Sequence, residues 1–222
     1  ESLAPIYDAM TSIRYIIQSI TKTGAEPEKG IKPPIQPIAD GWAIMPHIIN
    51  DLSVKLGKSI NLKTRGDDTE LDHRVLAKLK APMVHLVRNA CDHGIEAPEI
   101  RETANKPATG TVFLEARHEG DNIIVMVCDD GAGLAIDKIK QRAQANNLAS
   151  AEALEEMSEE EIQSFIFKAG FSTKDEVSKV SGRGVGMDIV RTSLEEIGAS
   201  VSVRSDNAKG TAFIIKAPRS IS

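Results

Sequence analysis

The chain has 222 residues, of which 41% are hydrophobic, and this length fits one domain with an appendage because domains run to roughly 100–200 residues. The 32 acidic and 27 basic side chains give a net charge of −5, and only 4% of the residues are aromatic, which argues against binding nucleic acid through its phosphates or by base stacking. The two cysteines, Cys91 and Cys128, form no CxxC pair, so the composition predicts neither a disulfide framework nor a zinc site.

Apolar runs in this sequence are short compared with the roughly 20 residues that span a bilayer. Residues 1–10 also lack the charged start and the apolar stretch of a signal peptide. We therefore expect a cytoplasmic protein that does not insert into a membrane.

Residues 1–22 predict an amphipathic helix, because their isoleucine and methionine residues recur at spacings of three and four. A proline-rich turn at 24–37 ends this helix, and a second helical pattern runs from Trp42 to Gly57. Neither helix can bury its apolar stripe alone, so the first must pack on the second, on the main domain or on another copy of the chain. We expect a helical hairpin or dimerisation region at 1–40 and one main domain at 41–219.

The rest of the chain alternates between strand and helix patterns. Two alternating apolar runs around Gly120-Asp121-Asn122 predict a β-hairpin. A helix is expected over 71–94, with Pro82 marking a break or a new start, and a second helix over 158–168 begins with the capping-box pattern Ser158 to Glu161. The other expected elements are helices at 135–147 and 185–197 and strands at 59–64, 200–205 and 210–217. This order favours an α+β fold, a two-layer α/β sandwich, over a doubly wound sheet.

The first polar motif lies in the helix predicted over 71–94. His85, Asn89 and His93 follow one another at spacings of four, so their side chains project from one helix face, one turn apart. Such a face offers two imidazoles and an amide oxygen to a ligand. A solvated surface face explains the same spacing.

The second motif is DxGxG, formed by Asp129, Gly131 and Gly133 after the apolar run Ile123–Val127. Asp129 is expected at the edge of a sheet, where its carboxylate can accept a hydrogen bond from an amino group in an apolar pocket. The glycines let the backbone turn tightly against a bulky neighbour. An ordinary Asp-Gly turn is the alternative interpretation.

The third motif places Gly182, Gly184 and Gly186 directly before a helix. Alternating glycines there expose backbone N–H groups and the positive end of the helix dipole, which suits a phosphate chain. The pattern is neither a Walker A loop nor a Rossmann fingerprint, because GxxxxGK(S/T) is absent and no strand leads directly into these glycines. A flexible hinge is the alternative interpretation.

These motifs, followed by Gly210-Thr211 at a strand start, occur in the order of the N, G1 and G2 boxes of the GHKL ATPase superfamily, which the sequence resembles. The segments HLVRNACDHGIE, VCDDGAGL, FKAGFSTKDEVSKVSGRGVGMDIV and GTAFIIKAP are similar to the catalytic domain of CheA-type chemotaxis histidine kinases, and RGDDTELD matches the same family upstream. The resemblance covers about residues 42–218.

The resemblance implies that the chain binds ATP with Mg²⁺. Asp129 is expected to bind the adenine and Asn89 the Mg²⁺, while His85 is expected to be the catalytic histidine near the γ-phosphate. His93 is a second candidate Mg²⁺ ligand. The other residues expected to bind ATP are Arg88, Gly131, Gly133, Ser172, Lys174, Gly182, Arg183, Gly184, Val185, Gly186 and Thr211.

The implied reaction is transfer of the ATP γ-phosphoryl group to a histidine of a separate phosphotransfer domain, with a response regulator downstream. A homodimer through the N-terminal helices and a coupling protein with a receptor array are the other implied partners. None of the five histidines is a convincing acceptor: His47 is the only one on an upstream helix, and the resemblance places that helix in the catalytic domain. We therefore expect a fragment of a longer kinase or a shortened member that acts in trans.

Two other functions stay open at this point. GHKL conformational ATPases share the same boxes, but their N box usually carries a glutamate as the general base for water, where this helix carries His85. A nucleotide-binding scaffold without catalysis is the second alternative, and the presence of every core box residue argues against it.

Overall fold

The computed structural model describes residues 34 to 171 and 186 to 221, which belong to one compact unit. The helix expected over 1–22 lies outside these described residues. Within them, no helix is long and apolar enough to cross a membrane. The elements in chain order are β1 Ile35–Pro37, α2 Ala39–Trp42, α3 Met45–Leu56, β2 Ile60–Arg65, β3 Glu70–Asp72, α4 His73–Asn89, the π-helix η1 Ala90–Gly94, α5 Pro98–Thr103, β4 Gly110–Glu119, β5 Asn122–Asp129, α6 Ile136–Ala145, α7 Ala151–Glu156, α8 Glu159–Ser164, the 3₁₀ helix η2 Phe165–Phe167, α9 Met187–Glu195, β6 Ser200–Asp206 and β7 Gly210–Pro218.

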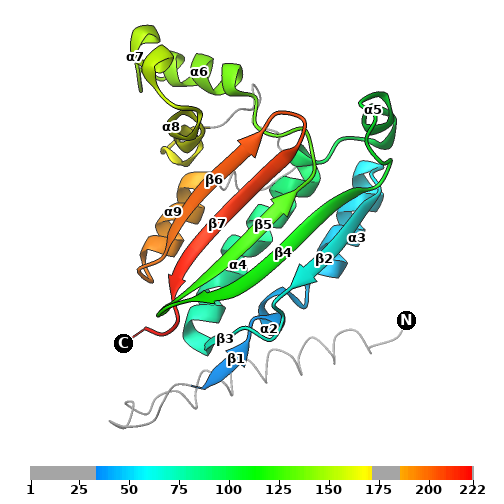
Figure 1. Cartoon of the computed structure of the whole chain (residues 1–222), viewed down its shortest axis with the longest axis vertical. Coiled ribbons are helices and arrows are strands. Elements are labelled where there is room, and N and C mark those ends of the chain that lie inside the picture. The colour runs from blue at the N-terminus through cyan, green and yellow to red at the C-terminus, as the bar shows by residue number, and fades with distance from the viewer. Residues whose placement is uncertain (1–33, 172–185, 222) are drawn as a thin grey trace, which may run out of the picture. The chain divides into compact units, whose positions relative to one another are not determined.

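The centre of the fold is a five-stranded sheet in the order β2-β4-β5-β7-β6 (Figure 1). β2 runs parallel to β4, and the other neighbouring strands are antiparallel. The hairpin predicted around Gly120 is confirmed as β4 and β5. Successive side chains of a strand point to opposite faces, so Val112 and Leu114 of β4 are fully buried while Phe113 between them is only partly buried.

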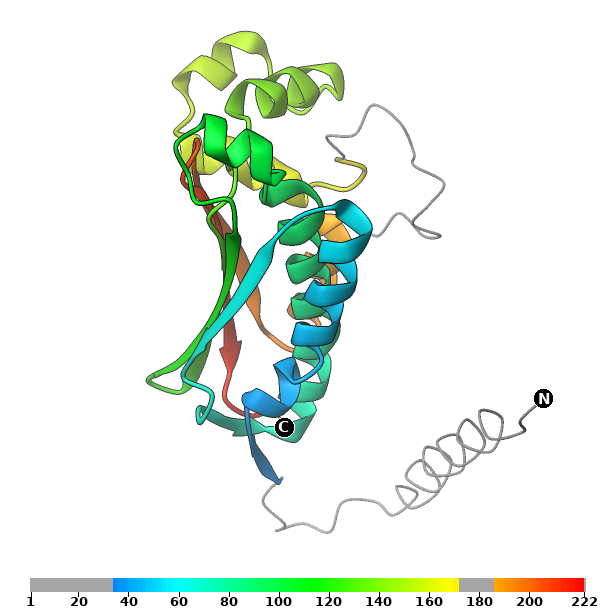
Figure 2. The same ribbon diagram turned by 90° about the vertical axis from the view of Figure 1, so that its right-hand side faces the viewer.

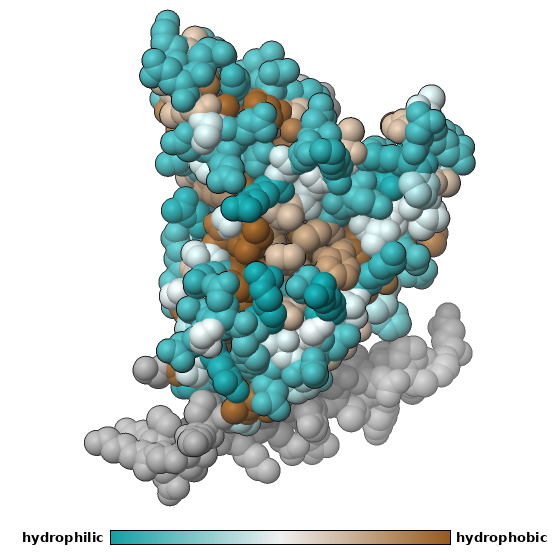
Figure 3. All heavy atoms as spheres, in the orientation of Figure 1, coloured by the Kyte–Doolittle hydropathy of each residue, from teal (hydrophilic) through white to brown (hydrophobic). Residues whose placement is uncertain are grey.

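The helices α3, α4 and α9 cover one face of the sheet (Figures 1 and 2). Their apolar sides form the core with the inward side chains of the strands: Leu79 and Leu86 of α4, Val125 of β5 and Ile215 of β7 are fully buried. Figure 3 shows the other face, where apolar side chains near the centre are surrounded by hydrophilic ones. The predicted two-layer α/β sandwich of the α+β class is confirmed.

α4 continues through Pro82, so the prediction of a helix break or restart at this residue is wrong. A proline inside a helix removes one backbone hydrogen bond and costs about 3 kcal/mol. Leu79, Pro82 and Met83 are all buried in the core. This packing on both sides of the proline outweighs the lost hydrogen bond and keeps the helix continuous.

The compact unit begins at Pro34 rather than at residue 41, which corrects the expected boundary. β1 falls within the turn expected at 24–37, yet it pairs with β3 in a small antiparallel sheet. Ile38, directly after β1, is fully buried in the core. Burial of this side chain and pairing of this strand explain why residues 34–40 fold with the main unit.

The two ends of the described unit meet at the beginning of α4. The N–H of His73 donates to the carbonyl of Pro34, and the N–H of Asp72 donates to the carbonyl of Arg219, both at 3.0 Å. The guanidinium of Arg74 contacts the carbonyl of Ile221. Since Asn122 pairs with Pro218, these ends lie at the end of the sheet opposite Asp129.

The helices α6, α7 and α8 gather beyond one end of the sheet (Figure 1). The capping box is confirmed, because the Ser158 side chain accepts from the N–H of Glu161 and the Glu161 carboxylate accepts from the N–H of Ser158. The Gln163 amide ties α8 to β6 through two hydrogen bonds with the backbone of Ser205, at 2.7 and 3.0 Å. The helices α5 and α7 were not expected from the sequence.

Candidate functional site

The DxGxG motif lies where β5 ends, beside the beginning of β7. Asp129, the last residue of β5, pairs with Thr211 in the sheet. Gly210, directly before Thr211, has a φ of +114°, and a Cβ atom there would lie 1.9 Å from the carbonyl oxygen of Asp129. Only glycine lets β7 begin this close to Asp129.

The carboxylate of Asp129 is buried at this end of the sheet, with 9% of the residue exposed. Its Oδ1 accepts a hydrogen bond from the N–H of Gly131 at 3.0 Å. Burial raises the pKa of Asp129 to about 6, although backbone hydrogen bonds from Gly131 and Thr211 act in the opposite direction. The negative charges of Asp130 and Glu96 raise this pKa further. A buried carboxyl group with a raised pKa is a candidate functional group.

The π-helix η1 brings the first polar motif to the DxGxG turn. The N–H of Ala132 donates to the carbonyl of Gly94, the last residue of η1, at 2.9 Å. A Cβ atom at Gly131 would lie 2.0 Å from that carbonyl oxygen. Gly133 has a φ of +78°, and a Cβ atom there would lie 2.5 Å from the carbonyl oxygen of Asp206. The glycines of the motif therefore allow two other backbone segments to approach closely.

The side chain of Asn89, the last residue of α4, contacts the beginning of α9. Its Nδ2 lies 3.2 Å from Sδ of Met187, which directly follows Gly186, the N-cap residue of α9. Asn89 therefore contacts the residue after Gly186, and η1 leads from Asn89 to the turn that follows Asp129.

His85 lies on α4, one helical turn before Asn89, and is partly buried. Burial lowers the pKa of His85, and the positive charge of Arg88 lowers it further, which favours the neutral imidazole. Arg88 is exposed. His93 lies in η1 rather than in the α-helix, so the single α-helical face expected for the three residues ends at Asn89. Nε2 of His93 is 3.1 Å from Oδ2 of Asp92.

A family model described as histidine kinase-, DNA gyrase B- and HSP90-like ATPase matches residues 79 to 221. This chain belongs to that ATPase family. The matched range takes in most of α4, the whole of η1 and four of the five strands of the central sheet.

Relatives of this ATPase domain include chemotaxis kinases. The chain is 42% identical over 183 residues to the chemotaxis protein CheA of Rhizobium meliloti. The aligned region covers 82% of this chain and 24% of that protein. It is 42% identical over 186 residues to CheA of Bacillus subtilis, covering 84% of this chain and 28% of that protein. The chain therefore spans about a quarter of the length of these curated relatives, and the ATPase domain is of the CheA type.

Solved structures support the fold of the ATPase domain. The catalytic domain of the histidine kinase ThkA is 15% identical and has a TM-score of 0.52, over 85% of this chain and 97% of that domain. The full-length kinase ShkA in complex with AMPPNP is 18% identical with a TM-score of 0.51, over 86% of this chain and 32% of that protein.

The residues expected to bind ATP fall into two groups. The structure describes Arg88, Asn89, Asp129, Gly131, Gly133, Gly186 and Thr211. Outside the described residues lie Ser172, Lys174, Gly182, Arg183, Gly184 and Val185. Thr211 is buried, and its hydroxyl lies 3.2 Å from the hydroxyl of Ser205, which ties the beginning of β7 to β6.

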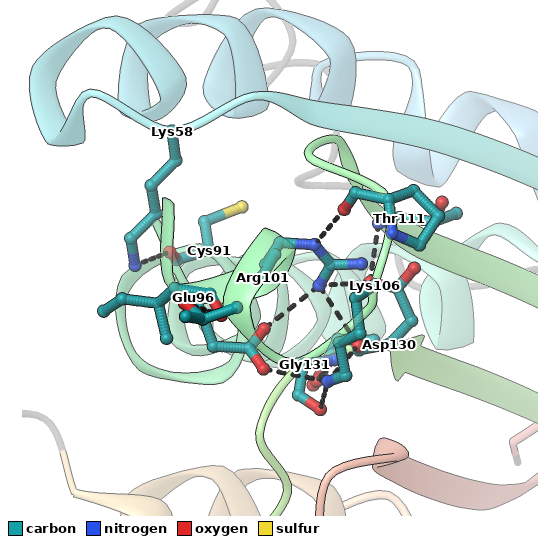
Figure 4. Close-up of polar contacts among 12 residues, drawn as sticks. Lys58, Cys91, Glu96, Arg101, Lys106, Thr111, Asp130 and Gly131 are labelled. Atoms are coloured by element: carbon teal, nitrogen blue, oxygen red, sulfur yellow. Dashed lines mark hydrogen bonds and ion pairs between the residues drawn. The ribbon is translucent and has the colours of Figure 1, made fainter. Parts of the chain in front are cut away.

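A buried charge network behind the DxGxG turn of the ATPase domain was missed from the sequence (Figure 4). Nη1 of Arg101, a side chain only 1% exposed, lies 3.0 Å from Oε2 of Glu96 and 3.1 Å from Oδ1 of Asp130. Its Nε donates to the carbonyl of Pro107 at 2.7 Å. Nζ of Lys106 lies 2.8 Å from Oε1 of Glu96. These charged residues lie in polar segments of the sequence. No periodicity in such a segment distinguishes a buried ion pair from a solvent-exposed surface.

Lys58 is a second residue that the sequence reasoning missed. Its ammonium group donates to the carbonyls of Cys91 and Asp92 in η1, each at 2.8 Å. Figure 4 shows the contact with Cys91. Burial lowers the pKa of Lys58. The lysine ties the segment before β2 to the π-helix that follows Asn89, and π-helical turns frequently occur at functional sites.

The side chains at this end of the sheet offer few metal ligands, which suits Mg²⁺ better than a metal ion whose ligands all come from the protein. The described residues contain no group of three or more His, Cys, Asp and Glu side chains placed to hold a metal ion. Mg²⁺ usually keeps several waters and takes one or two protein ligands together with substrate phosphates. The Asn89 side chain carries an amide oxygen of the kind that suits this role.

Proposed function

We propose that this chain is the ATP-binding catalytic domain of a CheA-like histidine kinase, an ATP-dependent protein-histidine kinase. The observation that supports this most directly is that the Asn89 amide contacts the beginning of α9 while Gly94, five residues further along the same helical segment, packs against the buried Asp129 carboxylate. The family match and the CheA relatives support the same function.

In this proposal, Asp129 accepts a hydrogen bond from the amino group of adenine. An ionised carboxylate has about four acceptor positions, and backbone hydrogen bonds from Gly131 and Thr211 leave acceptor capacity for a base. Because the carboxylate is buried, water competes little for the remaining positions, and a nucleobase amino group would be a strong partner.

The phosphates would extend from the adenine toward Asn89 and α9. Gly186 begins α9 without a side-chain capping hydrogen bond, so the positive end of this helix favours an anion. Asn89 would provide an oxygen ligand to Mg²⁺. A bound Mg²⁺ supplies neutralisation of the phosphate charge, and Asn89 fixes where that charge is held.

We assign the catalytic position to His85, toward the γ-phosphate. The lowered pKa favours the neutral form of this imidazole, which has one donor and one acceptor nitrogen and would hold a proton in place beside the phosphates. Arg88, exposed on the same helix, would add positive charge near the phosphate chain.

The proposed acceptor is a histidine on a separate phosphotransfer domain, in cis or in trans, and a response regulator would receive the group next. His47 is an unsuitable acceptor, because its helix α3 buries Met45 and Ile49 in the core of the ATPase domain. A homodimer and a coupling protein with a receptor array are further proposed partners.

The test mixes the protein with Mg-ATP labelled in the γ-phosphoryl group and an isolated phosphotransfer domain. Label on the acceptor histidine supports the kinase. Release of free phosphate alone would favour a conformational ATPase, and nucleotide binding without turnover would favour a scaffold. Asp129→Asn should abolish labelling, whereas Asp121→Asn, in the exposed hairpin turn, should not.

A further inference from the structure

Lys106 is placed directly behind the turn that carries Asp129. Its ammonium group contacts Oε1 of Glu96 at 2.8 Å, the carbonyl of Asp130 at 3.1 Å and the carbonyl of Gly131 at 2.7 Å (Figure 4). The side chains of Lys106 and Glu96 are 15% and 13% exposed. A lysine has three N–H donors, and here each has one acceptor.

Gly131 connects this lysine to Asp129. Its carbonyl accepts from Lys106, while its N–H donates to Oδ1 of Asp129 at 3.0 Å. This N–H belongs to the same peptide group as the Asp130 carbonyl, which Lys106 also holds, and the Gly131 carbonyl lies in the next peptide group. Lys106 therefore restrains both sides of a glycine, the residue with the widest choice of backbone conformations. The second restraint nearby is the hydrogen bond from Ala132 to the carbonyl of Gly94, at 2.9 Å.

We propose that Lys106 is a positioning residue, which holds the peptide groups on both sides of Gly131 so that the Asp129 carboxylate faces the amino group of the adenine ring. This inference rests on the proposed function, because it assumes that Asp129 contacts adenine. Lys106 itself would touch neither the base nor the phosphates. It acts on specificity for the base through Gly131.

Lys106 can be removed without breaking the rest of the network. Glu96 keeps its contact with Arg101 at 3.0 Å, and the Asp130 carbonyl keeps a hydrogen bond from Nη1 of Arg101 at 3.2 Å. The carbonyl of Gly131 is the group that loses its partner. Arg101 is a poorer choice for a test, because its side chain is 1% exposed and joins three segments.

The test measures the dissociation constants of Mg-ATP and Mg-ITP for the wild-type protein and for Lys106→Met. Both nucleotides have the same phosphates, but ITP has an oxygen in place of the amino group that Asp129 would bind. We expect Lys106→Met to reduce the preference for ATP over ITP by about tenfold, the equivalent of one hydrogen bond to a charged group. A structural defect would weaken both nucleotides equally and leave the ratio unchanged, which would overturn the proposal.

The matched control is Lys216→Met. Lys216 also contacts a glutamate at 2.8 Å, but it pairs with Glu119 on exposed surface toward the opposite end of the sheet. This variant should keep the wild-type ratio. Lys106→Arg retains the cation and several donors and should recover part of the preference, whereas a ratio as low as in Lys106→Met would contradict the positioning role.

A second readout needs no nucleotide. The carbon-13 signal of the Asp129 carboxyl, followed by NMR against pH, reports the hydrogen bond from Gly131, which lowers the pKa of Asp129. Lys106→Met should raise this pKa, and an unchanged pKa would overturn the proposal even if the variant does not bind nucleotide. If the wild-type protein binds neither ATP nor ITP, the proposed function fails, and the NMR comparison still decides whether Lys106 positions Asp129.

Discussion

Gly94, the last residue of η1, packs directly against the carboxylate of Asp129 at the end of β5. A Cβ atom at Gly94 would lie 2.9 Å from Cγ and 2.9 Å from Oδ2 of Asp129. Helix and strand meet this closely because residue 94 has no side chain. The position of the carboxylate therefore depends on where the helix ends.

The first prediction is that Gly94→Ala displaces the Asp129 carboxylate and weakens adenosine binding by about tenfold or more, because steric overpacking typically costs about 1–3 kcal/mol. Calorimetric titration with adenosine measures the effect. Gly120→Ala is the control, since Gly120 has a φ of +60° and open space around it. That control should lose about 1 kcal/mol of stability from backbone strain and keep its affinity.

Asp129→Asn should abolish adenine nucleotide binding while the fold stays intact. The amide at this position presents only one acceptor oxygen, and its NH₂ group would face the amino group of the base as a second donor. Circular dichroism checks the fold, and calorimetry with ATP checks the binding. Unchanged ATP affinity would remove Asp129 from the proposed role.

The pKa of Asp129 gives a prediction on pH. The folded-state pKa of about 6 lies above the ordinary value of 3.8, so the folded protein binds more protons than the unfolded chain between these values. The free energy of unfolding should therefore fall as pH rises from about 4 to 6, and this component should be missing in Asp129→Asn. Denaturant unfolding across this pH range measures it. Adenosine should lower the pKa of Asp129, because its amino group favours the ionised form.

Asn89→Ala should weaken ATP binding only when Mg²⁺ is present. We expect a loss of at least about tenfold with Mg²⁺ and little change with EDTA, because the adenine contacts are unaffected. Asn50→Ala, an exposed position on α3, is the control. Equal losses with and without Mg²⁺ would argue against a metal-binding role for Asn89.

Arg101→Met should strongly destabilise the domain. The variant removes the cation that lies 3.0 Å from Glu96 and 3.1 Å from Asp130. Breaking a buried ion pair costs up to about 3–5 kcal/mol, and the contact of Lys106 with Glu96 offsets part of this cost. Arg191→Met is the control, because Arg191 pairs with Glu195 on the surface at 2.7 Å and should cost about 1 kcal/mol or less. Urea unfolding compares the two variants.

Local patterns predicted the strands and long helices well. The hairpin of β4 and β5 follows from alternating side chains on both sides of a short turn, which are all near one another in sequence. The helices α5 and α7 were missed because each has only six residues, too few for a helical period to stand out. Pro82 misled the helix prediction because burial in the core is a tertiary effect that overrides local preference.

The site was only partly predictable. Asp129 has a local signal, since a carboxylate and two glycines follow an apolar strand, and the resemblance linked it to Asn89. Gly94 and Lys106 had no such signal: their roles come from contacts with residues 35 and 25 positions away along the chain, Asp129 and Gly131. No periodicity in a single sequence contains that information.

Pro34 and Ile221, at the two ends of the described unit, both contact the beginning of α4. Both ends of the described unit lie at one end of the sheet, while Asp129 lies at the other. A short linker could close the ends into a ring, and the backbone could then be cut elsewhere on the surface. Circular permutants of this unit would keep the end of the sheet with Asp129 unaltered. The site at that end would therefore not depend on where along the fold the chain begins and ends.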